Sequence, residues 1–85
     1  MAKIDKLIQK AISSPQNIKF DELCILCRRF GFTKESQEGS HIIYRRHTQP
    51  KRMISVQSDH GKAKPYQVNQ LLDWARENSF LEEDA

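Results

Sequence analysis

The chain has 85 residues, of which 38% are hydrophobic and 29% charged, so it has the size and composition of one soluble globular domain. It contains no apolar run near the ~18 residues of a membrane span, and its alternating charges at Met1-Ala2-Lys3-Ile4-Asp5-Lys6 exclude a secretory signal. We therefore expect a cytoplasmic protein with a single domain, residues 1–85, and no disulfide scaffold, since it has only two cysteines.

The positive charge is concentrated in one part of the sequence. Between residues 45 and 64, six Lys and Arg residues accompany a single acid, Asp59, so this segment carries +5 and the rest of the chain sums to −2. A basic middle between more acidic flanks indicates an anionic partner that is bound at one place. The six basic residues are Arg45, Arg46, Lys51, Arg52, Lys62 and Lys64.

Two amphipathic helices are predicted before the basic segment. Residues 3–12 and about 20–29 both repeat apolar side chains at the i, i+3, i+4 spacing of a helix face. Gly31 stands where a helix commonly ends in a left-handed residue. We expect the second helix to begin a core, residues 20–77, and the first to form an N-terminal extension, residues 1–18, that either covers the core or makes a dimer contact. The apolar stripe of the first helix is Ile4, Leu7, Ile8 and Ala11.

The pattern then changes to the two-residue period of β-strands. Strands are predicted over residues 32–37, 40–46 and 52–57, and two short turns join them. The lengths of these turns suit an antiparallel meander. Residues 60–64 are predicted to form a basic loop after the third strand.

A third helix closes the predicted domain. It begins at Pro65, a favoured first-turn residue, and ends near Asn78, after which Phe80 and Leu81 in a tail, residues 78–85, fold back onto the core. The order helix, helix, three strands, helix predicts an α+β fold in which helices cover one face of a three-stranded antiparallel sheet. The other face is then open to water or to a partner.

Strand parity indicates which side chains occupy the open face. On the second strand, Ile42 and Tyr44 share one face, whereas His41, Ile43 and Arg45 share the other. An arginine resists burial without a partner, and a tyrosine packs well in a sheet core. We therefore predict that Ile42 and Tyr44 point inward and that His41 lies on the open face.

The stretch Gly31-Phe32 … Gly39-Ser40-His41-Ile42-Ile43-Tyr44-Arg45, followed by basic strands and a closing helix, resembles the HicA toxin family. The resemblance implies a fold like the double-stranded-RNA-binding domain (dsRBD-like), α-β-β-β-α, here with an extra N-terminal helix. It also implies an endoribonuclease that cleaves messenger RNA (an mRNA interferase), with the His of the Gly-Ser-His triplet, His41, as the catalytic residue. The implied partner is a HicB-like antitoxin that covers the active face.

Besides the extra helix of residues 3–12, this chain departs from that family at two places. Ile42 stands where many members have a second His, and Pro65-Tyr66 stands where many have a Gly-Thr pair. Neither departure removes the catalytic residue that the resemblance implies.

RNA cleavage without a metal needs a proton carrier and some positive charge, because the ribose 2′-OH is an internal nucleophile. An imidazole, with an ordinary pKa of about 6.5, can carry a proton near neutral pH. We predict catalysis by His41 with no metal and no cofactor, and His60 is the one further imidazole that could assist. The predicted RNA-binding residues are Gly39, Ser40, Arg45, Arg46, Lys51, Arg52, Lys62 and Lys64.

A zinc site is the first alternative to consider. Cys24, Cys27, His41 and His47 follow the spacing C-x2-C-x13-H-x5-H, which is close to that of a zinc finger. Geometry argues against it, because the two His residues bracket a strand and six residues of strand span roughly 20 Å. The two Cys residues fall on the apolar stripe of a helix, where a free Cys packs as a small apolar side chain.

Two other functions remain open at this point. A domain of this fold can hold RNA through shape and phosphates without cutting it. An open sheet face that exposes Ile43 can also serve protein contact alone. Among the aromatic residues, Trp74 fits boundary packing better than base stacking, and Tyr66 fits a helix surface as well as it fits a contact with RNA or antitoxin.

Overall fold

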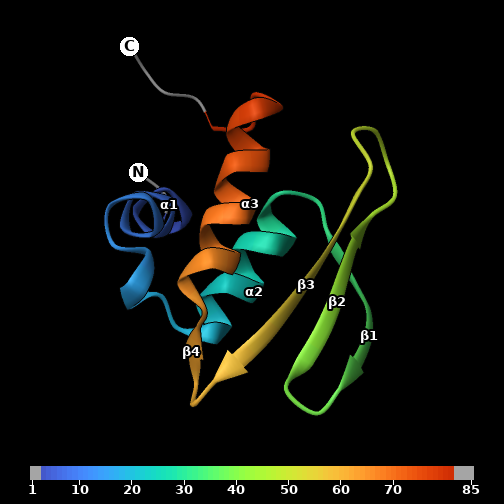
Figure 1. Cartoon of the computed structure of the whole chain (residues 1–85). Helices are drawn as coiled ribbons and strands as arrows, with labels where there is room; N and C mark the ends of the chain where they lie inside the picture. Colours follow the sequence, from blue (N-terminus) through green and yellow to red (C-terminus); the bar gives the residue numbers. More distant parts are fainter. Residues whose placement is uncertain (1–2, 82–85) are drawn as a thin grey trace.

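The computed structural model describes the backbone of residues 3–81 and the side chains of residues 6–81 (Figure 1). The predicted α+β fold is confirmed, with a sheet order of β1-β2-β3-β4 in which neighbours are antiparallel. The last part of the predicted tail, residues 82–85, and the side chain of Ile4 lie outside the described residues. The elements are α1 (Lys3–Ser13), the short 3-10 helix η1 (Pro15–Asn17), α2 (Phe20–Arg29), β1 (Thr33–Glu38), β2 (His41–Arg46), β3 (Arg52–Asp59), β4 (Lys62–Ala63) and α3 (Pro65–Glu77).

The strand β4 is a correction to the sequence prediction, which placed a basic loop at residues 60–64 beside a three-stranded sheet. β3 continues past its predicted end to Asp59, and β4 pairs back onto it through Ser58 and Ala63. The Ala63 amide also donates a hydrogen bond to the Ile18 carbonyl at 2.9 Å. A strand of two residues is too short to show a period, so only its pairing reveals it.

All the helices lie on one side of the sheet, as Figure 1 shows, and the main core fills the space between the two layers. The apolar stripe of α2 and that of α3 face the inward side chains of β2 and β3. Fully burying one such side chain contributes about 1.5–3 kcal/mol to folding. The core includes Leu23, Leu26 and Cys27 from α2, Ile42 and Tyr44 from β2, Ile54 and Val56 from β3, and Val68, Leu71 and Leu72 from α3.

The helix α1 covers part of this core. Ala11 is fully buried, Leu7 and Ile8 pack against the buried cluster, and α1 contacts both α2 and α3. Ile18, after η1, is fully buried as well. Of the two roles left open for the N-terminal segment, core cover is therefore the one observed.

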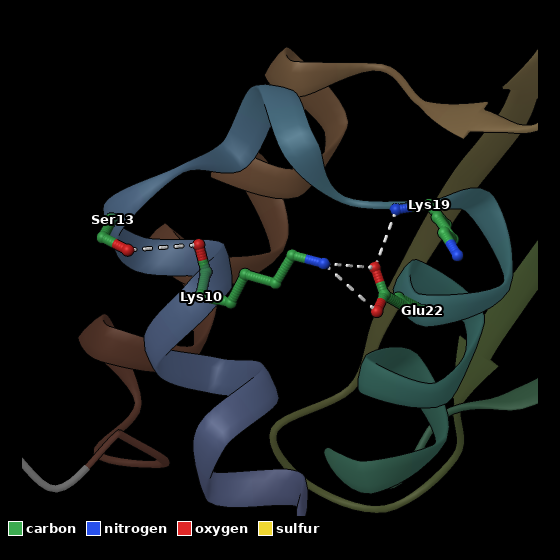
Figure 2. A network of polar contacts seen from close by, with 4 residues as sticks. All are labelled: Lys10, Ser13, Lys19 and Glu22. Carbon is green, nitrogen blue, oxygen red and sulfur yellow. Dashed lines mark hydrogen bonds and ion pairs between the residues drawn. The ribbon is translucent and has the colours of Figure 1, made fainter.

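A small polar network joins α1 to the start of α2 (Figure 2). The Glu22 carboxylate accepts a hydrogen bond from the Lys19 backbone N–H at 2.9 Å and pairs with the Lys10 ammonium at 3.3 Å. The hydrogen bond from Lys19, followed by the Lys10 contact, holds the pKa of Glu22 below its ordinary value. This arrangement satisfies an amide that a helix start would otherwise leave unpaired.

The end of the described chain folds back onto the core, as predicted. Trp74 is 7% exposed, and its ring stacks on that of Phe80 with centroids 5.1 Å apart. Phe32 meets the same indole edge-on at 5.1 Å. The predicted packing role of Trp74 is thus confirmed.

Candidate functional site

His41 is the first residue of β2 and is exposed on the face opposite the helices. Ile42 and Tyr44 are 6% and 1% exposed and point into the core. Ile43 and Arg45 share the open face with His41. Strand parity therefore gave the correct orientation for every side chain to which it was applied.

The imidazole of His41 is oriented by a hydroxyl on the neighbouring strand. Its Nε2 forms a hydrogen bond with Oγ of Ser55 on β3. In the register, His41 is opposite Gln57 and Ile43 is opposite Ser55, so Ser55 is the diagonal neighbour of His41. Among the described side chains and backbone, the other ring nitrogen, Nδ1, has no hydrogen-bond partner. When Nε2 donates to Ser55, Nδ1 is the basic nitrogen and is free to exchange a proton.

A lysine contacts the residue that lies opposite His41 on β3. The Lys64 ammonium donates to Oε1 of Gln57, the cross-strand neighbour of His41, at 3.4 Å. The Gln57 backbone N–H donates to Oε1 of Gln67 on α3 at 3.0 Å, and Gln67 is only 5% exposed. The start of α3 is thereby fixed against the end of β3, and the Lys64 ammonium is held on the side chain of Gln57.

Both turns at this end of the sheet lie close to the start of β2. Gly39 has φ +62°, and the Ser40 carbonyl accepts a hydrogen bond from the Ser58 amide at 3.1 Å. The β3–β4 turn lies at the same end (Figure 1), and Lys62, the first residue of β4, is exposed directly after it. His60 in that turn is almost fully exposed and contacts Asp59 at 3.0 Å. The structure thus brings Gly39, Ser40, Lys62 and Lys64 to the end of the sheet that carries His41.

The other four predicted RNA contacts lie at the opposite end of β2. Arg45 pairs with Glu35 of β1 at 2.8 Å, on the open face. Lys51 and Arg52 are exposed at the β2–β3 loop. Figure 1 shows that this loop and the β1–β2 turn are at opposite ends of the sheet. The predicted set is therefore divided into two groups, one around His41 and one around the loop.

Arg46 binds the protein's own backbone. Its guanidinium donates to the carbonyls of Phe30 at 2.9 Å, Pro50 at 3.1 Å and Gln49 at 3.2 Å. It also lies 4.8 Å from the centroid of the Phe80 ring. These contacts occupy donors that a phosphate would need, so the arrangement favours a structural role in which Arg46 ties the β2–β3 loop to the end of α2.

Gly31 leaves the space that Arg46 requires. Its φ is +93°, as expected for the residue after a helix, and a Cβ built there would stand 2.0 Å from Nη1 of Arg46. Any side chain at this position would therefore strain the backbone and displace the guanidinium.

The sequence analysis missed three residues of the site: Ser55, Gln57 and Gln67. The alternation of side chains on the third strand puts Ser55 on the opposite face from Ile54 and Val56. What the sequence does not show is the register, which decides whether Ser55 or another residue meets the ring. Gln67 is buried on the apolar face of the amphipathic helix α3. The signal that could have identified it is a polar residue at a helix position whose neighbours on the same face are apolar.

The cysteines belong to the core, as predicted. Cys24 is 8% exposed and Cys27 is fully buried. Burial raises the pKa of the Cys27 thiol to about 12, so this thiol stays protonated and is a poor nucleophile or metal ligand near neutral pH. Within the described part of the chain, no three His, Cys, Asp or Glu side chains are grouped so as to hold a metal ion.

The described helices include none with the length and apolar character needed to cross a membrane.

Comparison with known proteins gives one match. Residues 20–76 match the family model described as the HicA toxin of bacterial toxin–antitoxin. The matched segment begins with α2, includes the whole sheet and ends within α3. No curated protein and no solved structure gives a significant match to the chain.

Proposed function

Because the chain belongs to the HicA toxin family of bacterial toxin–antitoxin pairs, we propose that it is an endoribonuclease that cleaves messenger RNA and uses His41 as its catalytic residue. The observation that carries the proposal is the exposed imidazole with one nitrogen held by Ser55 and the other without a hydrogen-bond partner among the residues that the structure describes. A ring in this state can accept and return a proton without moving.

The chemistry follows from the structure of RNA. His41 takes the proton of the ribose 2′-OH, the 2′-oxygen attacks the adjacent phosphorus, and the bond from phosphorus to the 5′-oxygen breaks. The products are a 2′,3′-cyclic phosphate and a 5′-OH, whose proton comes from water or from the protonated ring. A positioned acid or base of this kind typically contributes about 10²–10⁴-fold to the rate. No step in this scheme requires a metal ion or a cofactor.

Positive charge at the same end of the sheet supports this reaction. The ammonium of Lys64 and that of Lys62 lie at the same end of the sheet as His41, where they can neutralise charge that develops on the phosphate. Gly39 and Ser40 are exposed in the adjoining turn, so a backbone N–H group there or the Ser40 hydroxyl can position the scissile group. His60, on the next turn, remains a candidate for assistance.

The partner that we propose is a HicB-like antitoxin protein that covers the open face in the cytoplasm. Two apolar side chains on this face support a protein contact. Ile43 is partly exposed at the centre of β2, and Met53 on β3 is 49% exposed. A partner that buries these two groups would also cover the imidazole of His41.

Cleavage of a single-stranded messenger RNA by purified protein tests the proposal. Wild-type protein should produce fragments with 2′,3′-cyclic phosphate ends, and His41→Ala should reduce the rate by at least about 10²-fold because the proton carrier is gone. Asn69→Ala, on the exposed side of α3, is the control and should cleave like wild type. Induced wild-type protein should also stop cell growth.

Two results would contradict the proposal. Cleavage by His41→Ala at the wild-type rate would remove the residue from the mechanism. Intact RNA that binds both proteins with salt-dependent affinity would indicate a binding module instead of an enzyme.

A further inference from the structure

A hollow of positive character lies at the loop end of the sheet, far from His41. Its volume of about 380 Å³ falls within the range of small-ligand sites. Every side chain that lines it is cationic or is an imidazole. The lining residues are Arg45, Arg46, His47, Lys51 and Arg52.

Two of these side chains shape the hollow and two are available to a ligand. Arg46 is held by backbone carbonyls, and Arg45 is paired with Glu35. Lys51 and Arg52 are exposed and have no hydrogen-bond or ion-pair partner within residues 6–81. A concave surface with two unneutralised cations attracts an anion more strongly than the same charges on a flat surface.

The distance from His41 suits one continuous ligand. The first and last residues of β2 are five steps apart, which corresponds to about 17 Å along a strand. With roughly 3.4 Å per phosphate along one stacked strand, this distance spans about five phosphates. The sheet face between the two ends is open. The regularly spaced phosphates of one nucleic-acid strand can therefore reach both groups of cations.

We propose that this hollow binds a backbone phosphate of the same RNA strand whose scissile bond lies at His41. The inference rests on the proposed ribonuclease function and adds to it a second contact several nucleotides from the cleaved bond. The protein should therefore prefer single-stranded RNA that is long enough to reach both ends of the sheet. Shorter RNA should bind only around His41.

The test measures the affinity of oligouridylates that range from about 4 to about 16 nucleotides. The protein carries His41→Ala so that the RNA stays intact during the measurement. Affinity should rise in a step at about six nucleotides, where the strand first reaches the hollow. Adding Lys51→Glu should remove this step, weaken long oligouridylates about five- to tenfold and lower the salt slope by about one.

Lys6→Glu provides the matched control. It changes the net charge by the same amount on the exposed surface of α1, in the helical layer, and should keep the step. Thermal unfolding of both variants checks that each is folded. A step that persists in Lys51→Glu, or an equal loss in both variants, would overturn the phosphate site.

Two further measurements separate the possible failures. If Lys51→Glu weakens binding of polyglutamate but not of oligouridylate, the hollow receives protein carboxylates and the RNA assignment is wrong. If wild-type protein fails to cleave RNA while the Lys51-dependent step is present, the proposed catalytic function fails and the phosphate site stands.

Discussion

A single hydroxyl orients the imidazole of His41, the proposed catalytic residue. Ser55 binds Nε2 from the neighbouring strand, and both residues belong to one hairpin. The ring is thus aligned without any contribution from the helices. In the proposed reaction, Ser55 would act through His41 as a positioning residue.

Replacing this hydroxyl tests the positioning role. Ser55→Ala should lower kcat by about tenfold, a fraction of the ~10²–10⁴ that a positioned acid or base supplies. KM should change little, because the hydroxyl is engaged with the ring. Ser55→Thr keeps the hydroxyl and should restore most of the rate.

The measurement is the dependence of kcat on pH for the three proteins. A change in its shape in Ser55→Ala, with recovery in Ser55→Thr, identifies a role through the imidazole. Equal rates and profiles in all three proteins would show that the hydrogen bond has no catalytic consequence.

The sequence predicted correctly which way the side chains of β2 point, but it did not predict the hydrogen-bond partners of His41 and Arg46. The alternation of side chains on the second strand put His41 and Arg45 on the same face. The preference of an arginine for solvent and of a tyrosine for a sheet core then identified that face as the open one. Ser55 could not be paired with His41, since register depends on loop geometry and on contacts between distant residues. The same limit applied to Arg46, whose chemistry suggested RNA but whose partners are backbone carbonyls brought together only by the fold.

At the scale of elements, periodicity identified the three α-helices and the three longer strands, but not the short 3-10 helix η1. The short β4 was missed because its stability comes from pairing with β3 and from Ile18, which no local pattern reveals. The start of α2 is also fixed by a contact between neighbouring elements, the network of Lys10, Lys19 and Glu22.

The network at the start of α2 predicts a dependence of stability on acid. The pKa of Glu22 is lower in the folded chain than its ordinary value of 4.5, so the ionised carboxylate favours folding. This stabilisation is complete above pH 4.5 and is lost as the pH falls through the lowered pKa. Glu22→Ala should cost about 1 kcal/mol at neutral pH, as loss of a helix cap does.

Urea unfolding across the acid range checks this prediction. The difference in unfolding free energy between wild type and Glu22→Gln should shrink on acidification, because the amide keeps a hydrogen-bond acceptor but never carries the charge. A constant difference from neutral pH down to about pH 3 would contradict the assignment.

At the scale of the whole molecule, the N-terminal segment is part of one core although the family match begins at residue 20. Ile18 is fully buried with the side chains of α2 and α3, whereas Ile12 is 44% exposed on α1. The two residues are chemically identical and lie six positions apart, so they form a matched pair.

Substitution of this pair measures how strongly the segment is integrated. Ile18→Ala should lower the unfolding free energy by about 2–5 kcal/mol, because it leaves a cavity in the core. Ile12→Ala, at a largely exposed position, should change it by about 0.5 kcal/mol or less. Chemical denaturation gives both values, and similar losses would mean that the N-terminal segment is not held as the structure describes.

The hairpin that joins His41 to Ser55 has a consequence for insertions and deletions. Surface loops usually tolerate changes of length. Here the β2–β3 loop sets the register between the two strands, and a slip of one residue would turn the side chain next to the imidazole to the other face. Among natural variants of this protein, gain or loss of a single residue between positions 47 and 51 should therefore be rarer than gain or loss in the turn after β3. This is expected even though the β2–β3 loop is farther from the imidazole than the turn after β3 is.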